Sequence, residues 1–312
     1  MQTLFNIINI PFGWALEFLS SLFGGNFAAA VFFFTLLINV ILIPLSIKSQ
    51  KSSVQQTRIK PKLDELKKKY GDDKQKYSEA MQKLYQEENV SMSGGCLPMV
   101  LRLVLMMSIY YLIMSPLTYL LHIDSATVTA AAEALGKNAN ARAELQIIEA
   151  VRNGTIDFPQ IASKLSAIDF NFFGIDLTQT PKFSFDIFHD AQPIWVMPII
   201  AFLAQMLTSA LSLVMQKKLN PDAPNMAGMM LTMPLLSLFI GFTLPGGVAF
   251  YWACSSLIGG LIQVGVQQFY GPQKMLSRER LKELNKECDF EENQLKKIKT
   301  NQTLLNGEAA EK

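Results

Sequence analysis

Residues 227–270 decide the fold class, because the stretch AGMMLTMPLLSLFIGFTLPGGVAFYWACSSLIGGLIQVGVQQFY contains no Asp, Glu, Lys or Arg. The tripeptide Pro245-Gly246-Gly247 divides this stretch into two apolar runs and predicts a tight turn between them. Each run approaches the ~20 residues that a helix needs to cross a hydrocarbon core of roughly 30 Å. The stretch therefore predicts a hairpin of two membrane-spanning helices, at 227–244 and 248–270.

The chain as a whole has the composition of an integral membrane protein. Of its 312 residues, 50% are hydrophobic and 17% are charged, and the charges lie in blocks, with none in residues 18–47 or 191–216. We therefore predict an all-α integral membrane protein with five transmembrane helices, at residues 27–47, 94–115, 193–215, 227–244 and 248–270.

The distribution of Lys and Arg predicts the orientation of these spans. Segment 48–93 carries 11 of these residues, the tail 271–312 carries 9 and the 216–226 loop carries two, whereas residues 1–26 carry none. The basic segments are expected in the cytoplasm. The N-terminus and the long 116–192 loop are then outside, and the C-terminus is cytoplasmic.

Residues 1–26 predict an interfacial helix on the outer leaflet. Trp14, Phe18 and Leu22 recur at helical spacing after a break expected at Pro11. A simple extension of the first span is the alternative, but the glycine pair that follows this stretch favours the interfacial helix.

Segment 48–93 has the pattern of a cytoplasmic helical hairpin. Gly71 suits the end of the first helix, and Asp72 or Asp73 the N-cap of the second. Each helix has a narrow apolar stripe, formed by Ile59, Leu63, Leu66 and Tyr70 and by Tyr77, Met81, Leu84 and Tyr85. A solvated coiled-coil spacer and a mobile arm that contacts a partner or the lipid surface both remain open.

Segment 116–192 is too long for a plain connection, and it predicts a small outer helical cap of unknown role. Helices are expected at 129–152 and 159–168. The two histidines of the segment, His122 and His189, have no Cys, Asp or Glu cluster at ligand spacing. No metal site is therefore predicted.

The tail 271–312 predicts a charged helix. Its alternating acidic and basic residues favour a solvated helix over one bound to ribosomal RNA or anionic lipid. The three cysteines, Cys96, Cys254 and Cys288, lie far apart, so no disulfide framework is expected. No cleaved signal peptide is predicted either, because the first basic residue is Lys48.

Arg102 is the one charged residue inside a predicted span. It lies roughly 10 Å deep at 1.5 Å per residue, where an arginine costs about 2.5–3.5 kcal/mol on insertion scales. No Asp or Glu within the spans can pair with it. One explanation of this buried charge is that the Arg102 side chain snorkels toward the headgroups. We favour the other explanation, that Arg102 faces a water-filled cavity open to the cytoplasm.

Other polar residues recur where they would face the same cavity. In the third span they lie at i, i+3, i+4 and i+7, which is one stripe of a helix. The candidate substrate groove comprises Arg102, Asn39, Gln205, Thr208, Ser209, Ser212, Ser256 and Gln263. A positive, hydrated groove would attract an acidic segment and shorten its path through the low-dielectric core.

The sequence contains no set of residues for catalysis or cofactor binding. It has no glycine-rich phosphate loop and no Ser/His/Asp, Cys/His or paired-carboxylate set placed at the membrane. A net charge of +2 gives no sign of nucleic-acid binding, and no DNA partner is expected. We therefore predict neither an enzyme nor a cofactor.

Several short motifs follow one another along the chain. They are Ile43-Pro44-Leu45-Ser46-Ile47-Lys48-Ser49, Pro61-Lys62-Leu63-Asp64-Glu65-Leu66-Lys67, Leu84-Tyr85-Gln86-Glu87-Glu88-Asn89-Val90, Gly94-Gly95-Cys96-Leu97-Pro98, Asn171-Phe172-Phe173-Gly174-Ile175-Asp176-Leu177, Met233-Pro234-Leu235 and Leu244-Pro245-Gly246-Gly247-Val248-Ala249-Phe250-Tyr251-Trp252. Together they resemble the YidC membrane protein insertase family, bacterial relatives of the mitochondrial and chloroplast insertases. The resemblance covers about residues 25–120 and 168–270.

This resemblance implies a five-span core with a groove open to cytoplasm and lipid, in the bacterial plasma membrane. It implies insertion and folding of small membrane proteins, alone or beside the Sec translocon. Nascent membrane proteins and the lipid bilayer are the implied partners, and the ribosome is a further candidate through the hairpin or tail. A groove arginine is expected to attract acidic residues of the substrate, whose hydrophobic segment leaves along the third and fifth spans.

The sequence departs from the family pattern at that arginine. The family arginine is expected at Asn39, and an uncharged polar residue such as Gln at Arg102. We expect that the charge has moved between two groove-lining helices, with Asn39 as the hydrogen-bonding neighbour of Arg102. A specialised paralogue in which Arg102 points elsewhere is the alternative. The long 116–192 loop is a second departure, and the lack of a large extracytoplasmic domain favours a Gram-positive-like member.

A solute transporter or channel is the main alternative function. Transporters tend to have repeated halves and ionisable residues at the midplane, and the sequence has no internal repeat and one ionisable residue in its spans. A structural scaffold is a further alternative, but it would not need an unpaired intramembrane arginine.

Overall fold

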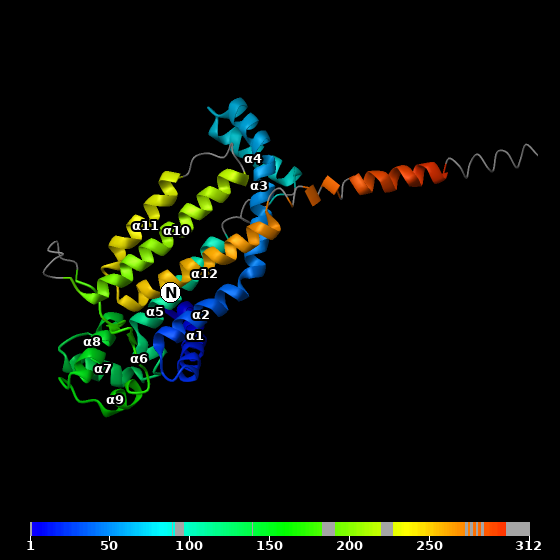
Figure 1. The fold of residues 1–312 in the computed structure, drawn as a ribbon. Helices are drawn as coiled ribbons and strands as arrows, with labels where there is room; N and C mark the ends of the chain where they lie inside the picture. Colours follow the sequence, from blue (N-terminus) through cyan, green and yellow to red (C-terminus); the bar gives the residue numbers. More distant parts are fainter. Residues whose placement is uncertain are drawn as a thin grey trace, which may run out of the picture. The chain divides into compact units, whose positions relative to one another are not determined.

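The structure, a computed structural model, describes residues 2–88, 90, 97–138, 140–182, 191–219, 227–271 and parts of 274–297. The chain divides into two units, Met1–Ser46 with Cys96–Gly265 and Ile47–Gly95 with Val266–Lys312, which are described separately. Figure 1 shows the elements, which are α1 (Gln2–Leu22), α2 (Phe27–Ile41), α3 (Ile43–Tyr70), α4 (Lys74–Glu87), α5 (Leu97–Met114), α6 (Pro116–Tyr119), α7 (Ser125–Ala134), α8 (Ala141–Arg152), α9 (Pro159–Leu165), β1 (Asn171–Phe172), β2 (Ile175–Asp176), η1 (Pro193–Trp195), α10 (Val196–Leu219), α11 (Ala227–Gly241) and α12 (Gly246–Tyr270).

Apolar helices dominate the first unit, as the sequence predicts. Within the described residues, Pro193–Met215 and Gly246–Tyr270 are long and apolar enough to cross a membrane. Helices α2 and α3 make a third crossing if the two form one span, and the apolar helices Leu103–Met114 and Met230–Gly241 are shorter. The structure is therefore that of a helical membrane protein, whereas the count of five spans and their orientation stay predictions.

Two differences from the predicted helices lie at or near prolines. The predicted span 27–47 is interrupted at Leu42, which separates α2 from α3. Pro44 has no N–H, so the carbonyl of Val40 lacks its usual donor four residues further on. The sequence also predicts a break at Pro11, but α1 continues through it. Pro11 lies on the exposed side of α1, where the missing hydrogen bond is not buried in the core.

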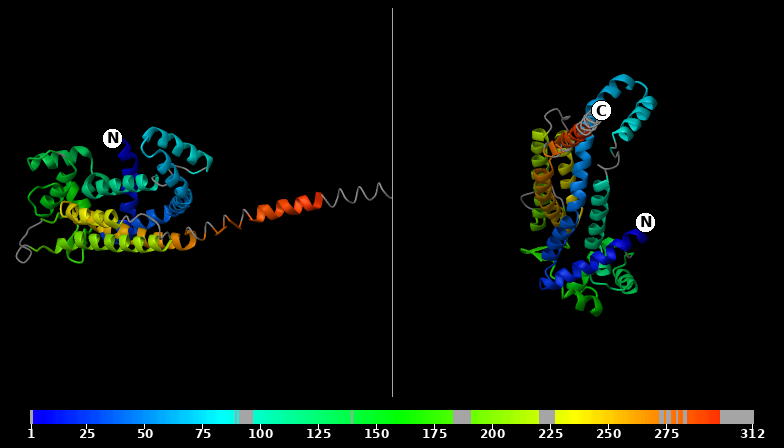
Figure 2. Two further views of the ribbon diagram at one scale, coloured as in Figure 1. Left: turned by 90° about the horizontal axis from the view of Figure 1, so that it is seen from above. Right: turned by 90° about the vertical axis from the view of Figure 1, so that its right-hand side faces the viewer.

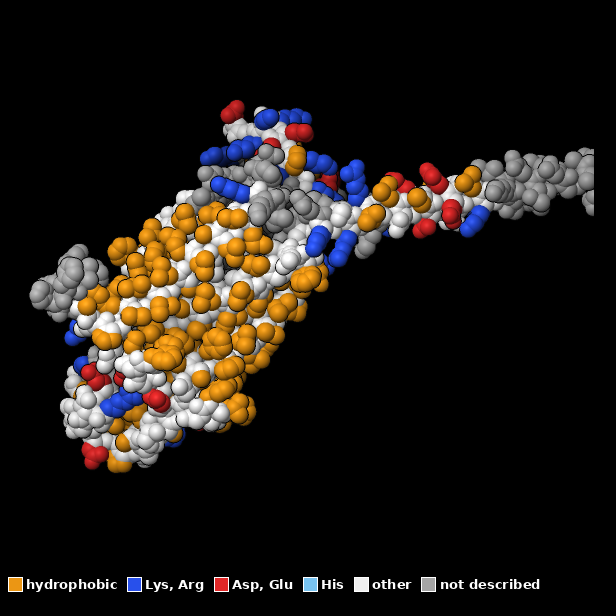
Figure 3. All heavy atoms as spheres, viewed as in Figure 1, with side chains coloured by type: hydrophobic (Ala, Val, Ile, Leu, Met, Phe, Trp, Pro, Cys, Tyr) orange, Lys and Arg blue, Asp and Glu red, His pale blue; other side chains and the backbone are white. Residues whose placement is uncertain are grey.

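The helices of the first unit present a wide apolar surface. Figure 3 shows it over α10, α11 and α12. On α10 the exposed large side chains form a helical stripe, made of Val196, Ile199, Ile200, Leu203, Leu207, Leu211 and Val214. Soluble monomers rarely expose so large an apolar patch, so this surface is suited to contact with lipid.

One apolar core joins these helices to a cap, which we define as residues 116–177. The views in Figures 1 and 2 place the cap at one end of α5 and α10. Leu16 of α1, Phe34 of α2, Leu112 of α5 and Ile147 of α8 are all buried in the same cluster. The cap is therefore packed onto the membrane helices as part of one unit.

The cap contains more elements than the sequence predicts. The helix predicted at 129–152 is divided into α7 and α8. Gly136 follows α7 with a φ of +67°, and the side chain of Asn140 N-caps α8 by accepting the Ala143 N–H at 2.9 Å. The antiparallel hairpin β1–β2, which pairs Phe172 with Ile175, is also absent from the prediction.

The second unit contains the helical hairpin α3–α4. Asp73 N-caps α4, as predicted. Glu88, just after α4, forms ion pairs with Arg58 and Lys62 of α3, so the end of α4 lies beside the middle of α3. Two of the predicted stripe residues are buried, Ile59 and Leu84. The residues described between 274 and 297 are helical.

Candidate functional site

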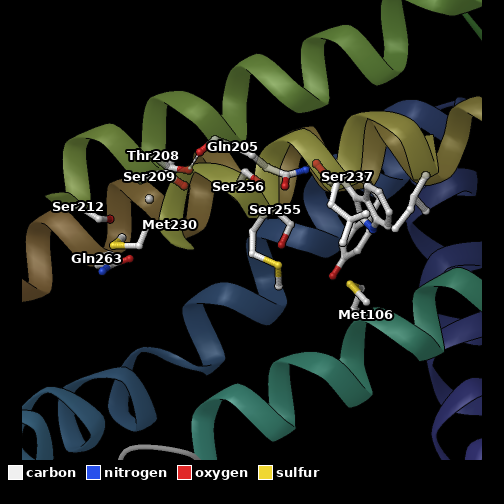
Figure 4. A pocket seen from close by; sticks show the side chains of 16 residues that line it. Met106, Gln205, Thr208, Ser209, Ser212, Met230, Ser237, Ser255, Ser256 and Gln263 are labelled. Atoms are coloured by element: carbon white, nitrogen blue, oxygen red, sulfur yellow. Dashed lines mark hydrogen bonds between the residues drawn. The ribbon is translucent and has the colours of Figure 1, made fainter. Parts of the chain in front are cut away.

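A groove lies between four helices of the first unit. Side chains of α5, α10, α11 and α12 line a cavity of about 470 Å³, and Figure 4 shows them gathered around a common space. This volume is within the range of ligand sites, roughly 300–1,000 Å³. Hydroxyl, amide and thioether groups are frequent in the lining, although the outer faces of the same helices are apolar.

Six of the eight predicted groove residues line this cavity. Four of them occupy one face of α10, namely Gln205, Thr208, Ser209 and Ser212. Ser256 and Gln263 come from α12, where a separation of seven residues is about two helical turns and keeps both on one face. The helical spacing in the sequence thus identified residues that the tertiary structure brings together.

Helix α10 has two chemically different faces. The leucines Leu203, Leu207 and Leu211 alternate in sequence with the groove residues but are exposed on the outer surface. The polar groove and the lipid-facing surface are thus separated by one helix, whose diameter is about 10–12 Å. A segment held in the groove therefore lies close to lipid.

Gly260 allows α12 to approach α10 closely beside the groove. A Cβ atom at this position would lie 2.5 Å from Cγ2 of Thr208. The Thr208 hydroxyl donates to the carbonyls of Ala204 at 3.1 Å and Gln205 at 3.0 Å within α10, which leaves the methyl group toward α12. Close contacts through small residues are typical of helices packed in membranes.

The groove also contains residues that were not among the eight predicted groove residues. Met106 of α5, Met230 and Met233 of α11 and Trp252 of α12 line it. The Nε1 of Trp252 is buried and has no hydrogen-bond partner among the described residues, so it is an unsatisfied donor in a residue of the groove lining. Met106 follows Arg102 by one helical turn, so the sequence could have indicated it as a groove residue on the same face of the helix. The other methionines resemble ordinary apolar residues of a span.

Arg102 and Asn39 are the two predicted groove residues outside this described lining. Arg102 lies on α5, but its side chain falls outside the described part of the chain. Asn39 lies on α2, and its Nδ2 donates to the carbonyl oxygen of Thr35 at 2.8 Å, a bond within its own helix. The predicted hydrogen bond between Asn39 and Arg102 stays a prediction.

No charged side chain lines the groove within the described ranges. In the first unit, the ion pair of Arg152 with Asp176 at 2.9 Å lies in the cap, and the Nε2 of His122 lies 3.1 Å from a carboxylate oxygen of Glu17. Across the described residues, no three His, Cys, Asp or Glu side chains gather as metal ligands, and His189 lies outside them. A single charge near the groove would therefore dominate its field.

Comparison with known proteins identifies the family. The family model of the 60Kd inner membrane protein matches residues 18–274. Among the relatives, the membrane protein insertase YidC 2 of Listeria innocua is 26% identical over 261 residues, which are 82% of this chain and 68% of the relative. The YidC insertase of Fusobacterium nucleatum is 24% identical over 240 residues, 77% and 85% of the two chains.

A third relative, the YidC insertase of Dechloromonas aromatica, is 25% identical over 254 residues, which are 81% of this chain and 34% of the relative. The match to the family model covers all of the helices that line the groove, together with the whole cap. It indicates a multi-pass protein of the bacterial inner membrane. The chain belongs to the 60Kd inner membrane protein family, that of the YidC membrane protein insertases.

Proposed function

We propose that this protein is a membrane protein insertase and folding chaperone, and not an enzyme. Its groove takes up the acidic tail of a small membrane protein, and the hydrophobic segment of that substrate leaves along α10 and α12. The observation that carries the proposal is a polar groove between helices whose outer faces are apolar. The insertase names of its relatives support it.

The groove lowers the barrier to moving a polar tail into the membrane. A charged side chain at the bilayer centre costs about 2.5–3.5 kcal/mol on insertion scales. The hydroxyl and amide groups of Gln205, Ser209 and Ser256 offer hydrogen bonds that lipid cannot supply. A tail in the groove then has only the remaining thickness of the membrane to cross, driven by its hydrophobic segment and the membrane potential.

Arg102 supplies the positive charge of the groove in this proposal. Its register on α5, one turn before the lining residue Met106, supports that role. A guanidinium binds a carboxylate through two parallel hydrogen bonds. Asn39, at similar depth on α2, occupies the position where the family arginine is expected. For binding the acidic tail, the electric field and hydration of the groove then matter more than which helix carries the charge.

Helices α10 and α12 form the exit for the hydrophobic segment. Leu203 and Leu207 of α10 and Leu257 and Leu261 of α12 are exposed on these helices. The methionines of the groove have flexible, polarizable side chains that adapt to different partners. Such a lining suits substrates that share hydrophobicity but little sequence.

The N-terminus and the cap lie outside in this proposal, and the α3–α4 hairpin and the tail lie in the cytoplasm. Ile7, Trp14, Phe18 and Leu22 are exposed along α1, which suits a helix lying on the outer leaflet. The cytoplasmic hairpin or tail would meet the nascent chain or the ribosome, and the Sec translocon is a further candidate partner.

Insertion of a single-spanning substrate with an acidic N-terminal tail into proteoliposomes tests the proposal. Arg102→Ala is expected to lower insertion roughly tenfold, equivalent to ~1.4 kcal/mol. Asn39→Arg combined with Arg102→Gln is expected to restore it. Arg142→Ala, which removes an exposed arginine of the cap, is the matched control and should have no effect.

A substrate with a neutral tail should be insensitive to all of these changes. Equal insertion of the acidic substrate by every variant would show that the charge is dispensable, and the function would then rest on the apolar faces of α10 and α12. An inert wild-type protein would contradict the proposed function itself.

A further inference from the structure

A second cavity lies beside the cap in the first unit. Its volume is about 460 Å³, and it is bounded by the first turns of α2, the β1–β2 hairpin and α12. Its walls are mainly aromatic, from Phe32, Phe33, Phe172, Phe173 and Phe250. We call this cavity the aromatic slot. Among the residues that the structure describes, it shares no lining residue with the polar groove, so it is a separate site.

Contacts between aromatic rings fix the walls of the slot. The ring of Phe172 lies 4.8 Å from that of Phe250 and 4.7 Å from that of Phe173, centroid to centroid. Phe33 stacks on Phe23 at 4.5 Å. Such distances are typical of packed aromatic pairs. The slot is therefore preformed, and a ligand does not have to open it.

The slot continues the surface that faces lipid. Phe32 and Phe33 are 40% and 39% exposed at its rim, and exposed Leu37, Val40 and Ile41 follow them along α2. In a membrane protein such an apolar surface is covered by hydrocarbon chains. The open side of the slot thus meets acyl chains.

The chemistry of the lining suits an uncharged, elongated apolar ligand. No Asp, Glu, Lys, Arg or His lines the slot among the described residues, and its amide groups come from Asn26 and Asn171. The Oδ1 of Asn26 accepts the Ala29 N–H at 2.8 Å, which leaves its Nδ2 to donate to a ligand. An apolar slot with a few amide donors matches an acyl chain with ester oxygens at its end.

Phe173 provides an independent sign of contact with lipid. Its side chain is 92% exposed, and its φ of +49° is followed by +85° at Gly174. Such a left-handed turn favours Asn or Gly, and a bulky aromatic residue is strained in it. Strained residues of this kind cluster at ligand-binding and switch sites. Among acyl chains, the exposed ring would have apolar surroundings.

We propose that the aromatic slot binds one acyl chain of a phospholipid from the leaflet on the cap side. The ester end lies at Asn26 and Asn171, and the ring of Phe173 is embedded beside the chain. The bound lipid fills the slot and holds the hairpin against the bilayer. Because no basic side chain of the described residues lines the slot, headgroup charge has little influence. The proposal concerns binding alone and does not require insertase activity.

Photo-crosslinking of the full-length protein in liposomes tests this proposal. The probes are phosphatidylglycerol and phosphatidylethanolamine with a diazirine on the acyl chain close to its ester, and labelled peptides are mapped by mass spectrometry. Residues 23–33 and 171–174 should carry more label than the exposed face of α10, equally with both headgroups. Ala29→Trp, which fills the slot, should lower this label roughly tenfold, and Phe173→Asn roughly threefold.

A matched control variant and a stability measurement distinguish a change in the slot from a general effect on the protein. Ala210→Trp, the same change at an exposed position of α10, is the matched control. Phe173→Asn should leave thermal stability unchanged or higher, because Asn tolerates the left-handed backbone better than Phe. A loss of label in that variant thus comes from the altered slot.

Several results would overturn the proposal. Unchanged labelling in Ala29→Trp, or even labelling along α10, would mean that only bulk lipid is present. Labelling that follows the headgroup would point to a charge-selective site instead. If a photoreactive residue in place of Phe33 cross-links to an inserting substrate while the lipid label disappears, the slot belongs to the substrate path.

Discussion

At the residue scale, the polar groove depends on Gly260, a position that has no side chain. Gly260 lets α12 reach the methyl group of Thr208, and the polar residues of both helices face the groove on either side of this contact. Thr208 is β-branched, so its side chain has little freedom to turn away. Gly260 is thus one position at which α10 and α12 approach each other closely.

Gly260→Ala is predicted to destabilise the protein by about 1–3 kcal/mol, the usual range for an overpacked core. The new Cβ would lie 2.5 Å from Cγ2 of Thr208, whereas a Cβ at Gly265 on the same helix meets nothing within 4 Å among the described residues. Gly265→Ala is therefore the control and should be neutral or slightly stabilising. Unfolding in detergent measures both. Adding Thr208→Ser should rescue Gly260→Ala, and equal losses in the two alanine variants would contradict the packing explanation.

At the element scale, a buried carboxyl group holds α8 against α6 within the cap. Glu144 is 5% exposed. Its carboxylate oxygens accept the backbone N–H of Thr118 at 3.1 Å and the Thr118 hydroxyl at 2.7 Å. Burial raises the pKa of Glu144 above its usual value of 4.5, and the hydrogen bonds from Thr118 only partly oppose this.

The raised pKa of Glu144 predicts a cap that becomes more stable on mild acidification. A carboxyl whose pKa is higher in the folded state contributes stability below the unfolded pKa, and this contribution is lost as pH rises through the folded pKa. The cap of the wild type should therefore exchange amide hydrogens more slowly near about pH 5 than near about pH 7.5, after correction for the intrinsic rate.

Glu144→Gln should reduce this pH dependence, because the amide does not titrate. Glu149→Gln, an exposed position on the same helix, should retain it and serves as the control. The pKa of Asp124 is lowered by hydrogen bonds from Thr127, so its contribution is lost only below about pH 4 and does not interfere. A wild-type cap that loosens on acidification from neutral pH would contradict the prediction.

At the scale of the whole molecule, the predicted orientation in the membrane can be tested through the accessibility of cysteines on its two sides. Cys288 in the tail is exposed and free, and Ser166 is exposed in the cap. In a variant with Cys96→Ser, an impermeant maleimide should label Cys288 only after the cells are permeabilised. With Ser166→Cys added, labelling should occur in intact cells. The reverse pattern would invert the predicted topology.

Much of the fold and part of the groove follow from the sequence alone. Uncharged runs of about 20 residues predict membrane helices because the partition of a segment between water and lipid depends on its own composition. The polar stripe from Gln205 to Ser212 was visible because helical spacing is a local property. The N-cap at Asp73 could be predicted for the same reason.

Only the tertiary structure decided which distant residues meet. It brought Met106 and Met230 to the same groove, joined Asn26 and Phe250 in the aromatic slot, and gave Asn39 a bond to its own helix. The physical reason is that lipid is as apolar as the surface of a membrane helix. Hydrophobicity therefore puts helices into the membrane but does not choose their neighbours. Complementary shape chooses the neighbours of a helix, through small residues and close packing. That shape depends on all the packed segments together.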